Sequence, residues 1–155
     1  MPDHHLAQIN IARLLHPIDD PRIADFVREL DPINALAEQS PGFIWRLKSP
    51  EGNATDIAYS EDPFVIVNMS VWVSLDTLKD YIYRSRHLEI FKQRRSWFEK
   101  MDKPHYCLWW IPAGHAPTVT EGRQRLEHYQ LHGSTPHSFW FSEPYPVQVL
   151  AQSKA

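Results

Sequence analysis

Seven residues between Trp72 and Met101 recur at steps of three and four positions, which is the spacing of one face of an α-helix. Most are apolar, but the set also contains an imidazole and a guanidinium. Small-molecule sites are mostly apolar with a few polar groups, whereas an ordinary core stripe would not include both of these. The pattern therefore predicts a helix from about Ser85 to Met101 that forms one wall of a pocket. Its residues are His87, Ile90, Phe91, Arg94, Trp97, Phe98 and Met101.

His87 is the first catalytic candidate in this set, because an imidazole titrates near neutral pH and can act as a general acid or base. It could take a proton from a phenol or an activated carbon acid, or bind a metal. The structural alternative is a histidine at a helix start that bonds to the backbone. Arg84 and Arg94 could hold an enolate, a phenolate or a carboxylate. The alternative for both is an ion pair with a neighbouring acidic residue.

Asparagines and aromatic residues could complete the pocket. Asn10, Asn34 and Asn68 each offer an amide that could bind a substrate oxygen, and the alternative is a cap or a bond at a strand edge. Flat side chains could form the walls, although core packing is at least as expected for any one of them. These aromatic candidates are Trp45, Trp72, Phe91, Trp97, Phe98 and Trp110.

The other histidines and the single cysteine favour structural roles. His128 and His132 are one helical turn apart, which suits a metal, but the sequence offers no evident third ligand and a solvated helix face is preferred. His115 lies between prolines and is interpreted as a loop brace, with a second pocket group as the alternative. Cys107 lies in the apolar run YCLWWI and is interpreted as a buried filler. We expect no metal site.

The composition describes one globular domain, residues 1–155, with 43% hydrophobic and 23% charged residues. A net charge of −3 argues against nucleic acid as the main partner. The sequence contains no run of about 18 apolar residues, the length that would predict a membrane span. The N-terminus lacks the pattern of a secretory signal. One cysteine allows no intrachain disulfide and fits a cytoplasmic location. Phosphate-loop, dinucleotide and hydrolase-elbow motifs are absent from the sequence.

The expected elements follow the order β-α-β-β-α-β, then a helix and a tail. This order predicts an α+β, ferredoxin-like fold, with helices on one face of an antiparallel sheet. The tail, about residues 134–155, is expected to be docked or partly disordered. The expected strands are residues 5–13, 43–47, 64–73 and 105–111, and the expected helices are residues 21–39, 75–83, 85–101 and 118–132.

Alternation along the first and third strands separates two faces of the sheet. The odd positions of both strands are apolar. The even positions carry Gln8, Asn10, Asn68, Ser70 and Trp72, and we expect these five side chains to share one face. A semi-enclosed cavity between sheet and helices would suit both the polar and the apolar members. A second copy of the chain is the simplest cover for the other face, which predicts a homodimer.

Four blocks of the sequence occur in the order of a known family: HLAQINIARL, DDPRIADFVRELDPINALAEQSPGFIWRL, NMSVWVSLDTLKDYIYRSRHLEIFKQRRSWF and LWWIPAGHAPT. Over roughly residues 4–145 the chain resembles the family called domain of unknown function 3291. That family is similar to the dimeric α+β barrel superfamily, which includes antibiotic-biosynthesis monooxygenases, small haem-degrading monooxygenases, stress-responsive barrel proteins and polyketide cyclases. The resemblance implies the fold and a homodimer, and it implies no single function.

The small haem-degrading monooxygenases allow a comparison by residue. They use an asparagine on strand one, a tryptophan on strand three and a histidine on the following helix. Asn10, Trp72 and His87 occupy similar elements here. His87 follows Trp72 by 15 residues, a longer spacing than that motif has and one nearer to other antibiotic-monooxygenase-like chains.

Three functions follow from these patterns. The first is an enzyme that acts on a hydrophobic metabolite without a cofactor, as a monooxygenase, cyclase or isomerase. In it His87 moves a proton, Arg84 or Arg94 steadies negative charge and the aromatic walls shape the substrate. The second is a haem-binding or haem-degrading protein with His87 as axial ligand. The third is a non-catalytic carrier or sensor of an apolar ligand.

Overall fold

The computed structural model describes residues 3–49, 55–84 and 94–147. Four strands form one antiparallel sheet in the order β2-β3-β1-β4, which confirms the predicted ferredoxin-like arrangement. The strands are β1 (His4–Arg13), β2 (Phe43–Arg46), β3 (Val65–Trp72) and β4 (Tyr106–Pro112). The helices are α1 (Ala24–Gln39), α2 (Leu75–Arg84) and α4 (Val119–His132), with 3₁₀ turns at Pro21–Ile23 and Arg94–Ser96.

Short polar side chains begin the helical segments where the sequence predicted them. Asp20 accepts a hydrogen bond from the backbone N–H of Arg22 at 2.8 Å, at the start of the 3₁₀ turn that leads into α1. Thr118 caps α4 by accepting from the backbone N–H of Glu121 at 3.1 Å. Each cap satisfies a backbone donor that has no partner inside its helix. These local signals explain why the helix starts were predictable.

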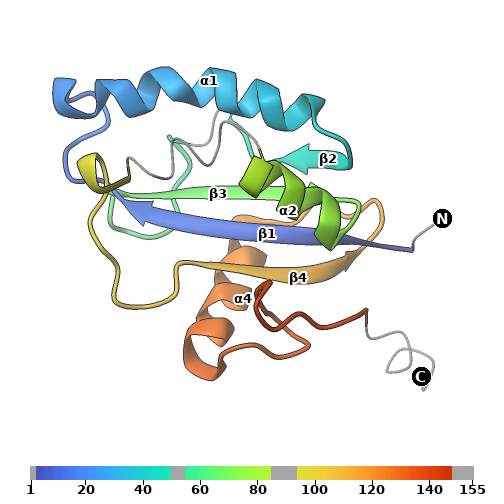
Figure 1. The fold of residues 1–155 in the computed structure, drawn as a ribbon. Helices are drawn as coiled ribbons and strands as arrows, with labels where there is room; N and C mark the ends of the chain where they lie inside the picture. Colours follow the sequence, from blue (N-terminus) through green and yellow to red (C-terminus); the bar gives the residue numbers. More distant parts are fainter. Residues whose placement is uncertain (1–2, 50–54, 85–93, 148–155) are drawn as a thin grey trace.

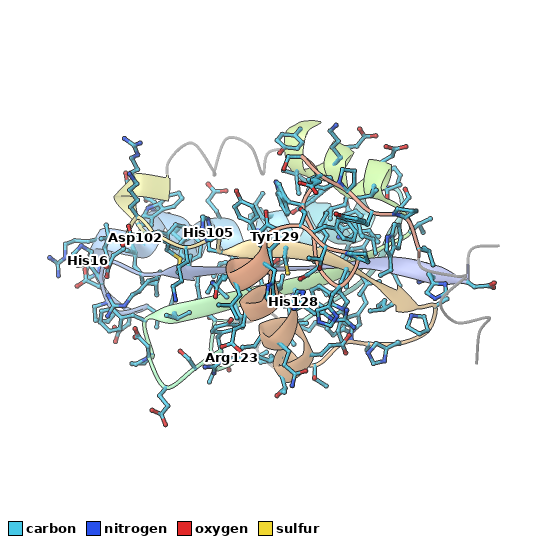
Figure 2. All side chains as sticks on the ribbon, turned by 90° about the horizontal axis from the view of Figure 1, so that it is seen from below. His16, Asp102, His105, Arg123, His128 and Tyr129 are labelled. Carbon is cyan, nitrogen blue, oxygen red and sulfur yellow. The ribbon has the colours of Figure 1, made fainter. Side chains whose placement is uncertain are left out.

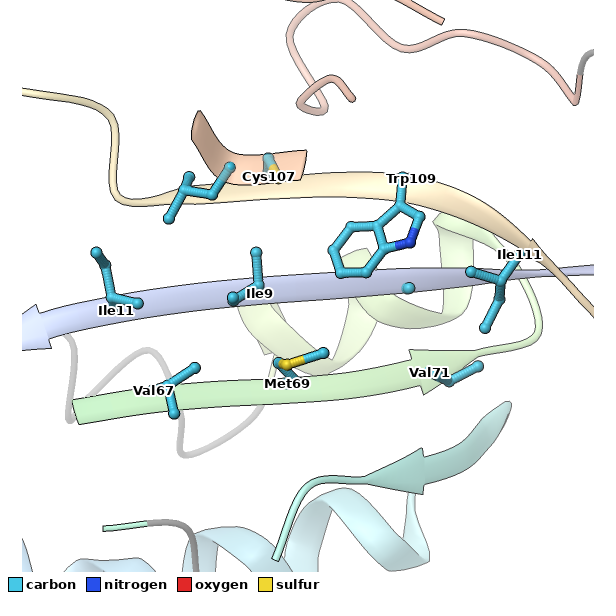
Figure 3. Packing of buried hydrophobic residues seen from close by; sticks show 10 residues of the cluster. Ile9, Ile11, Val67, Met69, Val71, Cys107, Trp109 and Ile111 are labelled. Atoms are coloured by element: carbon cyan, nitrogen blue, oxygen red, sulfur yellow. The ribbon is translucent and has the colours of Figure 1, made fainter. Parts of the chain in front are cut away.

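The molecule has three layers, with α1 on one side of the sheet and α4 on the other (Figure 1). The odd face of the sheet carries the odd-numbered side chains of β1, β3 and β4 and packs against α4. All of its main members are at most 5% exposed (Figure 3). They are Ala7, Ile9, Ile11, Val67, Met69, Val71, Cys107, Trp109 and Ile111, with Leu126 from α4.

A glycine allows α4 to approach this face closely. A Cβ atom at Gly122 would lie 2.8 Å from Ile9 Cδ1 and 3.1 Å from Met69 Sδ. The missing side chain therefore sets how deeply the helix can sit on the sheet, and the cost of a helical glycine is offset by this packing.

The even face, with the even-numbered side chains, packs against α1, α2 and part of the C-terminal tail. The tail reaches it along the outer edge of β4. There the backbone of Phe139 pairs with Leu108 through hydrogen bonds of 2.7 and 2.9 Å, and the Phe139 ring is fully buried. The described part of the tail, up to residue 147, is thus docked on the sheet.

The odd face is already covered within one chain. A second copy of the chain was expected to cover the face without helices, but both faces carry helices here: α4 and the partly buried side chains of Trp45, Leu47 and Tyr59 cover the odd face. Of the helices that the structure describes, α1 and α2 lie on the even face and α4 lies on the opposite side of the sheet. Homodimerisation remains a prediction, but the need to cover an exposed sheet face no longer supports it.

The predicted helix from Ser85 to Met101 is wrong for its C-terminal part. Residues 94–96 form a 3₁₀ turn, and the chain then runs alongside the end of β1. Leu15 N–H donates to Trp97 O and Glu99 N–H donates to Arg13 O, both at 2.8 Å, and Phe98 forms a bridge with Leu14. Pairing with a distant strand end overrides the local helical spacing. Residues 85–93, which include His87, Ile90 and Phe91, lie outside the described residues.

Candidate functional site

Four polar side chains form a connected strip across β1 and β3 on the even face. Gln8 Nε2 donates to Asn68 Oδ1 at 2.7 Å and to Ser70 Oγ at 2.8 Å. Asn10 Nδ2 donates to Gln8 Oε1 and to Asn68 Oδ1, each at 3.1 Å. The predicted grouping of these residues on one face is therefore confirmed. We call Gln8, Asn10, Asn68 and Ser70 the amide strip.

The strip passes from buried to exposed along its length. Gln8 and Ser70 are buried, Asn10 is half-buried and Asn68 is exposed. Asn68 lies on β3 opposite Asn10 of β1, beyond the part of β3 that pairs with β2, which extends from Ser70 to Trp72. Because Asn68 is exposed, the cover of the even face is incomplete at this position. Asn68 Oδ1 accepts two hydrogen bonds, while Asn68 Nδ2 donates none to any residue that the structure describes.

Two aromatic clusters lie on either side of the strip. At one end the ring of Trp72, fully buried, stacks on Tyr81 at a centroid distance of 5.0 Å and meets Phe43 edge-on at 5.5 Å. At the other end Trp97 and Phe98 pack on Phe26, with centroid distances of 5.6 and 4.9 Å. A strip of amides that becomes exposed at Asn68, between two apolar clusters, is the composition of a small-molecule site.

Arg46 is a candidate that the sequence analysis missed. The register of β2 places Arg46 directly opposite Ser70, so both side chains lie on the even face. Its side chain is 11% exposed, and its Nε donates to Glu38 Oε2 on α1 at 2.9 Å. Strict alternation along FIWR would have placed Phe43 with Trp45 and Arg46 with Ile44. The bulge between Phe43 and Trp45 instead brings Phe43 and Arg46 onto the same face.

The pKa of Tyr81 depends on its burial and on the charge of Arg46. Burial raises the pKa of its phenol, and the nearby charge of Arg46 acts in the opposite direction. The Tyr81 hydroxyl donates to Ile33 O of α1 at 3.3 Å. Tyr81 therefore stays neutral and joins the two helices that cover the even face.

The structure does not bring the predicted aromatic walls together. Trp45 packs into the odd face, opposite the strip. Trp97 is 3% exposed and belongs to a core cluster with Leu14 and Ile23. Trp110 lies under the tail, and its Nε1 donates to Tyr145 O at 2.8 Å. In the part of the chain that the structure describes, Trp72 and Trp110 pack in one cluster on the even face, and Trp97 and Phe98 pack in the other.

The remaining predicted residues cannot be placed by side chain. Arg84 ends α2 and Arg94 begins the second 3₁₀ turn, so their backbones flank the segment 85–93. His87 and Phe91 fall within that segment and lie outside the described residues. Their roles stay predictions.

A separate hollow of about 790 Å³ lies where β1 ends. Asp102 and His105 are labelled toward this end of the sheet in Figure 2. The hollow is lined by both apolar residues and residues of either charge. The lining residues are Ile11, Ala12, Leu15, Arg95, Phe98, Glu99, Lys100, Met101 and His105.

Histidines gather at the C-terminal end of α4. The ring of His128 lies 4.5 Å from the rings of both His132 and His137, and Figure 2 shows His128 on α4. Arg125 Nη1 donates to His137 O at 2.8 Å. Burial is the main cause that lowers the pKa of His128 and of His137. Among the described residues no His, Cys, Asp and Glu side chains are arranged to hold a metal ion.

His115 and Cys107 have structural surroundings. His115 Nε2 lies 2.6 Å from Glu121 Oε1, and Trp109 Nε1 donates to Glu121 Oε2 at 3.0 Å. This supports the interpretation of His115 as a brace. Cys107 is fully buried in the odd face, and burial raises the pKa of its thiol. A protonated thiol without access to solvent cannot serve as a nucleophile.

Comparisons with known proteins gave a family match and several distant structural similarities. A search of curated proteins found no match. Two solved structures with similarity to the chain both have TM-scores below 0.5. The NE2512 protein of unknown function from Nitrosomonas europaea is 11% identical, with a TM-score of 0.46, over 75% of this chain and 95% of that one. SnoaB, a cofactor-independent oxygenase from Streptomyces nogalater, is 14% identical, with a TM-score of 0.45, over 74% and 97%.

The family comparison covers almost the whole sequence. The model of the family described as domain of unknown function (DUF3291) matches residues 5–155. No helix in the described part of the chain has the length and apolar character needed to cross a membrane. The strip, the two aromatic clusters and Arg46 all fall within the matched range, and the chain belongs to the DUF3291 family.

Proposed function

We propose that this protein is an enzyme that binds a hydrophobic small molecule on the amide strip and needs no organic cofactor. The reaction class is an oxygenation, a cyclisation or an isomerisation that passes through a negatively charged oxygen. SnoaB, described as a cofactor-independent oxygenase, is one example of such chemistry. The proposal extends the DUF3291 assignment, which names no activity.

One observation carries the proposal: the exposed amide of Asn68 on β3, beside Asn10 of β1. Its oxygen is held by Gln8 and Asn10 at 2.7 and 3.1 Å, so the orientation of the whole amide is fixed. A fixed donor needs no reorganisation when charge develops on a substrate oxygen, which is the basis of electrostatic catalysis. Asn68 Nδ2 would donate to that oxygen.

The rest of the strip supports Asn68 rather than the substrate. Gln8 is buried and connects Asn68 to Ser70, and Ser70 also accepts from Trp72 Nε1 at 2.8 Å. Each polar group deeper than Asn10 thus has a protein partner. A substrate ring would lie against the apolar residues on either side, with its oxygen at Asn68. In this proposal His87 moves the proton, as predicted from the sequence.

The described residues support haem binding less well than they support the proposed enzyme. The groups of the strip are amides and a hydroxyl, and neither is a usual axial ligand of haem iron. Haem ligation would therefore depend entirely on His87. A carrier without catalysis would use the same strip and differs only in the absence of turnover.

The test combines binding with proton transfer. Exchange of the α-protons of 2-tetralone in D₂O, followed by NMR, reports enolisation of an apolar ketone, and oxygen uptake with anthrone reports oxygenation. We expect wild-type protein to accelerate at least one of these. Asn68→Ala should slow it by about 10²- to 10³-fold, the usual cost of one oxyanion donor. His87→Ala should abolish it.

Gln130→Ala is the matched control, because the Gln130 amide lies on α4, on the opposite side of the sheet from the strip, and donates to Pro104 O at 2.8 Å. It should leave the rate within twofold of wild type, a change of about 0.4 kcal/mol. Equal rates in Asn68→Ala and wild type would show that the strip is not the site. Binding of an apolar probe with no turnover would favour the carrier, and a Soret band lost in His87→Ala would favour haem.

A further inference from the structure

We propose that the hollow where β1 ends is a binding site for a small apolar acid, an anion with one carboxylate on a hydrocarbon body. None of the members of the amide strip lines this hollow. The inferred site is therefore separate from the strip, and it goes beyond the proposed function.

The hollow exists because the chain opens along one side of β1. Ile11 N–H donates to His105 O at 2.8 Å, and Glu99 N–H donates to Arg13 O at 2.8 Å. On β1 these two contacts are two residues apart, but on the other side residues 100–104 lie between them. The longer segment has to bow away from β1, and Figure 1 shows it, in yellow, as a loop that leads into β4.

The size and the apolar part of the lining suit a hydrocarbon body. A volume of about 790 Å³ lies within the range of about 300–1,000 Å³ that ligand pockets occupy. Leu15 is 38% exposed, so a hydrocarbon bound there would remove apolar surface from water. The apolar lining residues are Ile11, Ala12, Leu15, Phe98 and Met101.

Two cations of the lining are available to an anion. Arg95 and Lys100 both line the hollow, and both are exposed. Neither side chain forms an ion pair or a hydrogen bond with any residue that the structure describes. Arg95 offers a rigid donor fork that fits a carboxylate, and Lys100 offers an ammonium on a flexible stem. Both can turn toward a carboxylate held in the hollow.

The acidic residue of the lining already has a cation. Glu99 forms an ion pair with Arg13, and Arg13 Nε also donates to Asp62 Oδ2 at 2.8 Å. These three groups together carry one negative charge. Arg95 and Lys100 carry two positive charges, so one positive charge remains beside the hollow. This balance suits a singly charged carboxylate better than a doubly charged phosphate.

A water-filled surface depression is the competing explanation. In that case Arg95 and Lys100 are simply solvated, as most exposed cations are. A depression of this kind binds no acid in a saturable way, and any weak binding of an apolar molecule does not depend on a carboxylate. A built site prefers the acid over its uncharged ester.

The first measurement compares 11-(dansylamino)undecanoic acid with its methyl ester, which lacks the negative charge. Both fluorescent probes are titrated into wild-type protein and into the double variant Arg95→Gln with Lys100→Gln. Lys103→Gln is the matched control, because Lys103 is an exposed lysine of the same loop that does not line the hollow. Asn68→Leu shows whether the probes bind at the amide strip instead.

We expect wild-type protein to bind the acid more tightly than the ester. The double variant should weaken binding of the acid by at least about fivefold, the upper range for an exposed ion pair, and leave the ester unchanged. Lys103→Gln and Asn68→Leu should both leave the acid within twofold of wild type. Equal affinities for acid and ester, or an unchanged acid affinity in the double variant, would overturn the inference.

The second measurement places the ligand and does not depend on the double variant. The chain has three methionines, of which Met101 lines the hollow and Met69 is buried on the odd face. In protein labelled with ¹³C at the methionine methyl groups, decanoate should shift the Met101 signal saturably and the Met69 signal less. Met101→Leu assigns the signal. A Met101 signal that does not respond to decanoate would overturn the inference, as would acid binding lost in Asn68→Leu.

Discussion

The indole Nε1 of Trp72 donates a hydrogen bond of 2.8 Å to Ser70 Oγ, two residues earlier on the same strand. Ser70 Oγ also accepts from Gln8 Nε2 at 2.8 Å. The fully buried tryptophan of the aromatic cluster is thereby tied to the amide strip, so the apolar packing of one end of the even face and the polar order of its centre depend on each other.

Replacing this tryptophan should test the connection. Trp72→Phe removes the indole donor and part of a fully buried ring, and we expect it to lower the free energy of unfolding by about 1–3 kcal/mol. Trp110→Phe is the matched control, because it removes an indole donor to Tyr145 O in a half-buried position. Urea unfolding measures both, and an equal or larger loss in Trp110→Phe would contradict the prediction.

Because α4 contacts the sheet closely at Gly122, we expect the stability cost of a substitution at Gly122 to depend on the side chain of Ile9. Gly122→Ala should gain helix propensity of about 1 kcal/mol but lose about 1–3 kcal/mol through overpacking against the Ile9 methyl at 2.8 Å. We therefore expect a net destabilisation. Ile9→Val removes that methyl, so it should cost less in the Gly122→Ala protein than in wild type. Strictly additive costs in a double-mutant cycle would show that the two residues do not meet.

The docked tail should be part of the cooperative fold. Phe139 is fully buried beside Leu108, and Phe139→Ala should cost about 3–5 kcal/mol of unfolding free energy. Phe141 is two residues away and half-buried, so Phe141→Ala should cost clearly less. Thermal unfolding followed by circular dichroism compares the two. A Phe139→Ala protein as stable as wild type would mean that the tail contributes nothing.

The histidines at the end of α4 predict a loss of stability in acid. Burial first, and then the charges of neighbouring groups, lower the pKa of His128 and His137 below the ordinary value of 6.5. The folded protein therefore binds these protons less tightly than the unfolded chain does. Their contribution is present above pH 6.5 and is lost as the pH falls through the lowered pKa values of the folded state. Urea unfolding between pH 7.5 and 5 should show this slope.

A double variant identifies its source. His128→Gln combined with His137→Gln removes both titrating groups, so the slope over this pH range should become shallower. His16→Gln leaves the cluster intact and should keep the wild-type slope. An unchanged slope in the double variant would assign the acid sensitivity to other groups.

The single thiol should react only after unfolding. Cys107 is fully buried on the odd face, and burial raises the pKa of its thiol. We expect no modification by iodoacetamide at pH 8 in native protein and complete modification in 6 M guanidinium chloride, measured by mass spectrometry. Rapid modification of the native protein would mean that α4 does not stay on the sheet.

Local patterns in the sequence predicted a large part of this architecture. Alternation in β1 and β3 has a period of two, so the polar residues Gln8, Asn10, Asn68 and Ser70 had to share a face once both strands were identified. Helix starts at Asp20 and Thr118 were equally predictable, because a cap bonds to a backbone group only two or three residues away. Neither conclusion needs knowledge of distant contacts.

Only the tertiary structure determined which segments that are distant in the sequence contact one another. The spacing of Arg94, Trp97 and Met101 fits a helix, yet the segment after Ser96 pairs with the end of β1 because the long-range backbone bonds outweigh a weak local preference. The position of α4 on the odd face and of Trp45 away from the strip depends on packing. Arg46 reaches the even face only through the register and bulge of β2 against β3. Sequence periodicity states which residues share a face of one element, and only the pairing of elements states which faces meet.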